Sequence, residues 1–179
     1  TGKHAVHFAA NLPTLQWQPT DPDESARRSI EAWREHARLP NLLPPLPLDV
    51  CQPNWPLAEA AAIVCINMIH ISPWASTLAL FSGAATLLTA GAPVVLYGPY
   101  RREAVPTAPS NEAFDQDLRR RNPAWGLRQL ETVDEVAGRE GFERVALVEM
   151  PANNLTLVYR KRAAGIKPSV RASDLPRLQ

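Results

Sequence analysis

Apolar positions recur along the chain with two periods, one typical of helices and one typical of buried strands. Residues 60–68 and 92–97 are nearly continuous apolar runs, as expected for strands buried on both faces of a parallel sheet. Apolar residues at helical spacing predict an amphipathic helix over residues 24–38. The same patterns predict further helices at residues 1–11, 72–88, 111–121 and 133–140 and further strands at residues 15–18, 48–50, 144–149 and 155–160.

Caps and prolines set the expected ends of these elements. The 18 prolines fall into clusters that mark loops. Ser72 is the expected cap of one helix, with Pro73 in its first turn, and Ser110 or Asn111 is the expected cap of another.

Strands alternate with helices until the last two strands, which a short connection joins. These two are therefore expected to pair antiparallel. The order of elements predicts an α/β open sheet with helices on both faces. Ligands of such sheets bind beyond the carboxyl ends of the strands. The residues expected there are Asp21, Asp49, residues 67–70 and residues 97–101.

Composition narrows the class of protein. A chain of 179 residues with 45% hydrophobic residues and a net charge of +1 predicts one domain without the basic surface of a nucleic-acid-binding protein. The longest apolar stretch, residues 60–71, is too short to span a membrane. Cys51 and Cys65 lie among apolar residues without metal-ligand spacing, so we expect reduced thiols, a cytoplasmic location and no metal site.

The chain begins with a Thr-Gly turn that opens a helix. The amino end of a helix carries unpaired N–H groups, and glycine at Gly2 would let a polar ligand approach the backbone. Asp21 follows Gly2 by 21 − 2 = 19 positions, at the end of the next strand, where doubly wound folds bind a ribose. The alternative is that Asp21 or Asp23 caps the following helix, and Asp23 fits that role better.

His70 is the strongest candidate for acid–base chemistry, because it follows a buried strand and precedes a helix. A neutral imidazole there could take a proton from an oxygen, nitrogen or sulfur nucleophile, or it could bond only a loop carbonyl, and the sequence leaves both open. Trp74, Tyr97 and Tyr100 could wall an apolar pocket and flank a methyl sulfonium. Plain core packing is the alternative, and it is favoured for Tyr97.

A helix at residues 111–121 presents Asn111, Asp115 and Arg119 on one face. Such a face could grip a small polar or anionic substrate. The alternative is a solvated surface with an Asp115–Arg119 pair. Asn153 and Asn154 lie in the tight connection between the last strands, where a turn role suffices and a substrate role is an alternative.

Several uncommon runs of residues follow one another along the chain: Thr1–Ala5, Trp17–Asp21, Leu48–Val50, Ile66–Trp74, Leu96–Tyr100, Ser110–Asp115 and Met150–Asn154. Together, in this order, they resemble the methyltransferase-like protein 26 family, which was first defined as a domain of unknown function. The resemblance extends from Thr1 to about Arg160 and leaves residues 161–179 as a C-terminal tail.

The resemblance implies a class I methyltransferase domain over residues 1–160. Its fold is a Rossmann-like, open and mostly parallel seven-stranded sheet with an antiparallel last strand. The cofactor implied is S-adenosylmethionine, with S-adenosylhomocysteine as product. The family's first strand and the earlier glycine of its cofactor turn have no counterpart here, so we expect the natural protein to be longer at its N-terminus.

The resemblance also implies roles for residues at the strand ends. Gly2 would close the turn at the amino-acid end of the cofactor, Asp21 would bind the ribose, and Asp49 and Val50 would face the adenine. The complete cofactor set is Thr1, Gly2, His4, Asp21, Asp49, Val50 and Asn67. The expected catalytic residues are His70 and Asn67. The expected substrate-binding residues are Trp74, Tyr97, Tyr100, Asn111, Asp115, Arg119 and Asn153.

The function predicted from these points is methyl transfer to an oxygen, nitrogen or sulfur atom of a small molecule, without nucleic-acid or membrane partners. A protein substrate, a non-catalytic cofactor-binding module and a homodimer are left open. A dinucleotide-dependent oxidoreductase is disfavoured, because the chain lacks a full Gly-x-Gly-x-x-Gly run and closes with an antiparallel pair.

Overall fold

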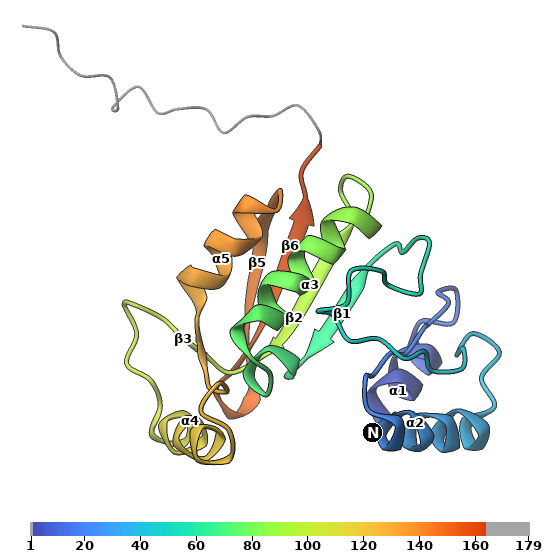
Figure 1. Ribbon diagram of the computed structural model, residues 1–179, viewed down its shortest axis with the longest axis horizontal. Coiled ribbons are helices and arrows are strands. Elements are labelled where there is room, and N and C mark those ends of the chain that lie inside the picture. The colour runs from blue at the N-terminus through green and yellow to red at the C-terminus, as the bar shows by residue number, and fades with distance from the viewer. Residues whose placement is uncertain (1, 164–179) are drawn as a thin grey trace, which may run out of the picture. The chain divides into compact units, whose positions relative to one another are not determined.

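The structure is a computed structural model that describes residues 2–163. It divides the chain into two compact units with the boundary between Ala58 and Glu59. We call them unit 1 and unit 2, and each is described by itself (Figure 1).

Two packed helices form the core of unit 1. They are α1 (Lys3–Asn11) and α2 (Glu24–Ala37), which confirms both predicted helices. Gly2 precedes α1 in a left-handed conformation (φ 92°), and a Cβ there would lie 3.0 Å from the Cα of Ile30 on α2. The need for glycine at this position is therefore explained by helix packing. The cofactor role of Gly2 stays a prediction.

Asp23 caps α2, as expected. Its Oδ1 accepts a hydrogen bond of 2.7 Å from the backbone N–H of Ala26. Its carboxylate also accepts the hydroxyl of Ser25, and these bonds lower the pKa of Asp23.

The strands predicted at residues 15–18 and 48–50 are not formed. Instead, two isolated parallel bridges join Trp17 to Leu42 and Thr20 to Leu46. The Leu46 N–H donates to the Pro19 carbonyl at 3.0 Å, and the Asp21 N–H donates to the Leu46 carbonyl at 3.2 Å. A proline lacks a backbone N–H, so the prolines at positions 19, 44, 45 and 47 prevent a continuous ladder.

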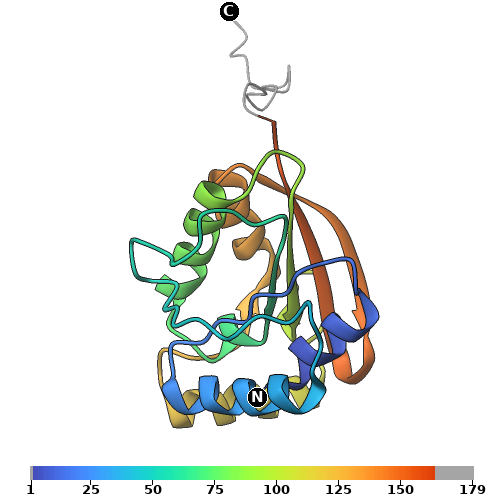
Figure 2. The same cartoon turned by 90° about the vertical axis from the view of Figure 1, so that its right-hand side faces the viewer.

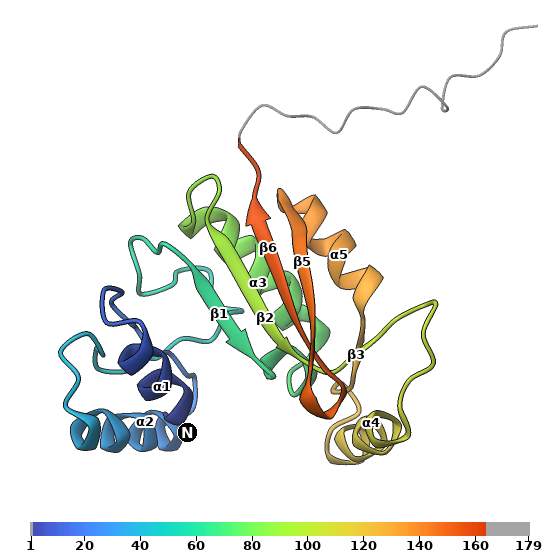
Figure 3. The same ribbon diagram turned by 180° about the vertical axis from the view of Figure 1, so that it is seen from behind.

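Unit 2 is built on a four-stranded sheet in the order β1-β2-β6-β5 (Figures 1 and 3). Its strands are β1 (Ile63–Ile66), β2 (Pro93–Gly98), β5 (Phe142–Met150) and β6 (Asn154–Lys161). β1 pairs parallel with β2, and β6 pairs antiparallel with both β2 and β5. The antiparallel closing pair is thus confirmed.

The predicted seven-stranded, mostly parallel sheet was wrong in detail for the described residues. The main sheet of unit 2 has four strands, and one of its pairings is parallel. β1 was expected to be a long, fully buried strand, but it has four residues, all half-buried. It lies at the edge of this sheet, and an apolar run alone does not distinguish an edge strand from a central one.

Two helices cover one face of this sheet, where helices on both faces were expected. They are α3 (Trp74–Leu87) and α5 (Leu130–Arg139). Figure 2, in which α3 is green and α5 orange, shows both helices on the same side of the strands.

The remaining elements of unit 2 are short or lie at its end. Two short strands, β3 (Tyr100–Arg101) and β4 (Arg128–Gln129), pair parallel. The 3₁₀ helices η1 (Met68–His70) and η2 (Pro151–Asn153) follow β1 and β5. α4 (Pro109–Arg121) completes the set.

The predicted helix caps of unit 2 were wrong. Pro73 stands at the N-cap position of α3, and the Ser72 hydroxyl instead donates to the sulfur of Met68 at 3.3 Å. α4 starts earlier than expected, with Ala108 at its N-cap, so Ser110 and Asn111 lie inside the helix. Pro109 stands at the first position of α4, where its fixed φ favours a helix start without a side-chain cap, whereas Pro73 lies just before the first turn of α3.

An aromatic cluster fills the core between the helices and the sheet. Phe81 on α3 is fully buried, with ring centroids 5.8 Å from Phe142 and 5.3 Å from Tyr159. The Tyr159 hydroxyl donates to Asp134 on α5 at 2.8 Å, which satisfies the polar end of a buried ring. Among residues 2–163, none of the helices combines the length and apolar character needed to cross a membrane.

We expect Phe81→Ala to lower the free energy of unfolding by about 3–5 kcal/mol, because it leaves a cavity where three rings meet. Urea unfolding followed by circular dichroism measures this loss. The matched control is Phe114→Ala on α4, where the ring is 40% exposed and the loss should stay below about 1 kcal/mol. Equal losses for both variants would contradict the assignment of Phe81 to the core.

Candidate functional site

The parallel pairing of β1 and β2 brings two chain segments together at one sheet edge. Ile66 pairs with Tyr97 at the carboxyl ends of the strands, and the Asn67 N–H donates to the Tyr97 carbonyl at 2.8 Å. Asn67 then adopts a left-handed conformation (φ 58°) that turns the chain into η1. His70, the last residue of η1, therefore lies near Gly98, which ends β2, and near Tyr100, which begins β3.

His70 is fully buried, and its ring nitrogens have no hydrogen-bond partner among the residues that the structure describes. The ring packs edge-on against Tyr100, with centroids 4.9 Å apart and planes at 78°. An unpaired buried polar atom costs about 1–3 kcal/mol. Such atoms in a folded protein mark a place for a ligand or a water molecule.

Gly98 leaves the space in which the side chains of His70 and Asn67 converge. A Cβ on Gly98 would lie 2.5 Å from Nε2 of His70 and 3.0 Å from Oδ1 of Asn67. Gly98 also has a φ of 155°, which side chains of L-residues rarely allow. The two predicted catalytic residues thus meet over a backbone that only glycine can form.

Burial keeps the titratable groups of this site uncharged. Burial, assisted by the positive charge of Arg128, lowers the pKa of His70 to about 3. Burial raises the pKa of Tyr100, whose hydroxyl also lacks a partner within the described part of the chain. Burial raises the pKa of the Cys65 thiol to about 12. At neutral pH the site therefore contains a neutral imidazole, a phenol and a thiol.

A second segment, residues 126–128, holds the backbone around His70 in place through hydrogen bonds. The Gly126 N–H donates to the His70 carbonyl at 3.0 Å. The Arg128 guanidinium donates to the carbonyls of Ile69 at 2.9 Å and Ser72 at 2.6 Å, on either side of His70. Sequence reasoning missed Gly126 and Arg128, since bonds to backbone carbonyls leave no pattern in the sequence.

Asp115 anchors this second segment. Its Oδ1 accepts the Leu127 N–H at 2.7 Å, and its Oδ2 accepts Arg101 at 3.1 Å and Arg119 at 3.0 Å. Burial would raise the pKa of Asp115, but the bonds from Arg119, Leu127 and Arg101 outweigh it and lower the pKa. The Asp115–Arg119 pair is present, although Asp115 is buried rather than solvated. The substrate roles of both residues stay predictions.

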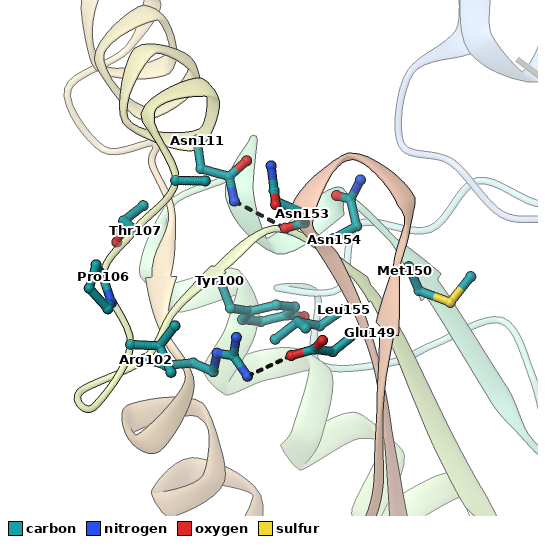
Figure 4. A pocket seen from close by; sticks show the side chains of 12 residues that line it. Tyr100, Arg102, Pro106, Thr107, Asn111, Glu149, Met150, Asn153, Asn154 and Leu155 are labelled. Carbon is teal, nitrogen blue, oxygen red and sulfur yellow. Dashed lines mark hydrogen bonds and ion pairs between the residues drawn. The ribbon is translucent and has the colours of Figure 1, made fainter.

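A cavity of about 190 Å³ lies between the loop of residues 102–108, the start of α4 and the turn from β5 to β6 (Figure 4). It brings together three predicted substrate residues, Tyr100, Asn111 and Asn153, and also Asn154. The Asn111 side chain donates to the Asn153 carbonyl at 3.0 Å. Trp74, Tyr97 and Arg119 do not belong to its lining, and Trp74 lies instead under Arg128, 5.6 Å from the guanidinium carbon.

The predicted cofactor residues fall into both units. Thr1 lies outside the described residues. In unit 1, Oδ1 of Asp21 accepts the Asp23 N–H at 3.0 Å, and Oδ1 of Asp49 accepts the Cys51 N–H at 2.9 Å. His4 is exposed on α1, Val50 is half-buried, and Asn67 belongs to unit 2. Within residues 2–163, no group of three His, Cys, Asp or Glu side chains is placed to hold a metal ion.

We expect the buried imidazole to make stability depend on pH. The unfolded chain binds a proton at His70 below about pH 6.5, whereas the folded chain does so only near pH 3. Between about pH 6.5 and pH 3 the unfolded chain therefore binds one more proton than the folded chain. The free energy of unfolding falls by about 1.4 kcal/mol for each unit by which the pH falls through this window. The difference in unfolding free energy between wild type and His70→Gln, measured across the window, should show this slope. His36→Gln, at an exposed position on α2, is the control and should not.

We expect Arg128→Lys to cost about 1.5–3 kcal/mol of unfolding free energy, because an ammonium cannot reach the carbonyls of Ile69 and Ser72 with a planar fork. Hydrogen exchange of the Gly126 amide should speed up in the same variant, since that amide bonds the His70 carbonyl. Arg120→Lys, at an exposed position on α4 with a surface partner, is the control and should cost less than about 1 kcal/mol. An unchanged Gly126 amide would show that Arg128 does not hold this segment.

Solved structures with low sequence identity share the fold. An O-methyltransferase family protein from Burkholderia thailandensis matches with a TM-score of 0.79 and 12% identity, over 91% of this chain and 48% of that one. The S-adenosylmethionine-dependent methyltransferase SibL, in its apo form, matches with a TM-score of 0.75 and 16% identity, over 90% of this chain and 48% of SibL. LepI in complex with S-adenosylmethionine matches with a TM-score of 0.71 and 15% identity, over 90% of this chain and 40% of LepI.

The chain spans about half the length of these proteins or less. At such low identity the likeness shows an α/β methyltransferase-like fold, and the cofactor complexes are properties of the neighbours. The resemblance to the methyltransferase-like protein 26 family stays a prediction. The family described as a protein of unknown function (DUF938) matches residues 1–161, and the chain belongs to that family.

Proposed function

We propose that the chain catalyses methyl transfer from S-adenosylmethionine to a nucleophilic atom of a small molecule. The observation that carries the proposal is His70, a buried imidazole without a partner in the described chain, at the carboxyl ends of two parallel strands. Ligands of open α/β sheets bind at such ends. The methyltransferase-like fold supports the choice of cofactor.

The residues around His70 suit a cofactor of this type. Gly98 leaves room where a side chain would collide with His70 and Asn67, and the Asn67 amide can donate and accept hydrogen bonds. The cofactor roles predicted for Gly2, His4, Asp21, Asp49, Val50 and Asn67 are part of the proposal.

S-adenosylmethionine supplies an electrophilic methyl group on a sulfonium, and its transfer to the acceptor leaves S-adenosylhomocysteine. The chain has to orient the acceptor, exclude water and take one proton. An oxygen that has gained a methyl group holds its proton far less tightly than the free hydroxyl. An unprotonated His70 nitrogen can therefore take that proton even with a pKa near 3. Positioning supplies the larger share of the rate.

We expect S-adenosylhomocysteine to bind with micromolar affinity in calorimetric titration of the full chain. Asp21→Asn should weaken binding by about tenfold or more, because it removes a charged acceptor for ribose hydroxyls. Asp117→Asn is the matched control, at a partly exposed position on α4, and should leave binding unchanged. No binding to wild type would remove the cofactor from the proposal.

A second test measures both the binding of S-adenosylhomocysteine and the rate of methyl transfer in one variant. His70→Gln should bind S-adenosylhomocysteine like wild type but lose about 100-fold or more in methyl transfer to acceptors from a metabolite extract. Cofactor binding without turnover in wild type would favour a non-catalytic binding module.

A further inference from the structure

We propose that the cavity beside α4 is the acceptor subsite and that it takes an uncharged compound about the size of one ring, bearing at least one hydroxyl group. The inference rests on the proposed function and adds the class of substrate. Its walls come from unit 2 alone: the loop of residues 102–108, the start of α4, and the turn between β5 and β6 (Figure 4).

The size of the cavity sets the upper limit on the ligand. Its volume is about 190 Å³. A protein cavity of about 150 Å³ holds benzene. One ring with one or two small substituents therefore fills the site, whereas fused rings would project into solvent.

The charge of the lining argues for a neutral ligand. Its charged side chains are Arg102 and Glu149, which pair with each other at 3.2 Å (Figure 4). Both charged groups of the wall are already paired, so a charged ligand would gain a countercharge only by breaking this pair, in which the Glu149 side chain is 73% exposed. A neutral ligand leaves the Arg102–Glu149 pair intact.

The uncharged groups of the lining suit a ring with a hydroxyl. The Tyr100 ring and Leu155 supply apolar surface. Asn111 and Asn153 supply amide groups that are each held by a hydrogen bond. The Asn111 side chain donates to the Asn153 backbone carbonyl at 3.0 Å, and the Asn153 side chain donates to the Ser110 hydroxyl at 3.2 Å, so little side-chain entropy is lost on binding.

Tyr100 connects the subsite with His70. Its ring lines the cavity, and it contacts the His70 ring edge-on at 4.9 Å. The Tyr100 hydroxyl is buried without a partner within residues 2–163, as are both His70 nitrogens. His70 does not line the cavity, and these three polar atoms are buried, so a ligand hydroxyl in the cavity would bond the amides of Asn111 and Asn153, with the Tyr100 ring between the ligand and His70.

The first test compares three probes on the wild-type chain: phenol, benzoate and benzylammonium. Chemical-shift changes in the backbone amides of Thr107, Asn111 and Leu155 report binding in this cavity. We expect phenol to bind about tenfold or more tightly than either charged probe. Benzoate binding as tightly as phenol, and lost in Arg102→Gln, would overturn the proposal in favour of a carboxylate site. Shifts confined to other amides would also overturn it.

The second test fills the cavity. Ala108→Leu extends a lining residue into it, and we expect phenol to bind about tenfold more weakly. The matched control is Ala104→Leu, an exposed position on the same loop outside the lining, which should change the affinity by less than about twofold. Unchanged affinity in a folded Ala108→Leu variant would overturn the proposal. The comparison of probes needs no variant and holds even if Ala108→Leu does not fold.

Titration with S-adenosylhomocysteine separates this inference from the function on which it rests. Cofactor binding without phenol binding in the cavity overturns the acceptor subsite and leaves the proposed function standing. Phenol binding without cofactor binding supports the cavity as a site for neutral rings and overturns the proposed methyl transfer.

Discussion

The buried carboxylate of Asp115 fixes the part of unit 2 that carries the candidate site. Its three donors come from β3, from its own helix α4 and from the turn before β4, so one side chain joins three elements. Gly126 in the same turn and Arg128 at the start of β4 hold the backbone around His70. A buried carboxylate is tolerated only when donors compensate for its lost hydration, and here two guanidinium groups and an amide do so.

Two glycines make this arrangement possible. A Cβ on Gly126 would lie 2.6 Å from Oδ1 of Asp115, and a Cβ on Gly98 would lie 2.5 Å from Nε2 of His70. Both glycines have positive φ values, 142° and 155°. The same solution is used twice: a missing side chain lets a polar group approach the backbone closely. The structural anchor and the candidate catalytic group therefore depend on glycine for the same physical reason.

Local patterns in the sequence predicted the helices and the closing strand pair, because periodicity and short connections act over a few residues. The strands were less predictable. The burial of β1 depends on which strands lie beside it, and prolines prevent continuous backbone pairing between the segments near Trp17 and Leu46. The rule that ligands of open α/β sheets bind beyond the carboxyl ends of the strands placed His70 and Asn67 correctly at the end shared by β1 and β2. The packing of Gly98 against His70 joins residues far apart in the sequence, and only the fold reveals it.

The unpaired groups of the candidate site bear on its selectivity. His70 and Tyr100 are neutral and buried, and the described chain offers their polar atoms no partner. An acceptor hydroxyl that reached one of these atoms would satisfy it, at about 1–3 kcal/mol, whereas an apolar compound of the same shape would leave it unpaired. A site built in this way discriminates against compounds that lack the hydroxyl more strongly than a hydrophobic pocket discriminates by size. In the proposed reaction, the imidazole that takes the acceptor's proton would thus also select the acceptor.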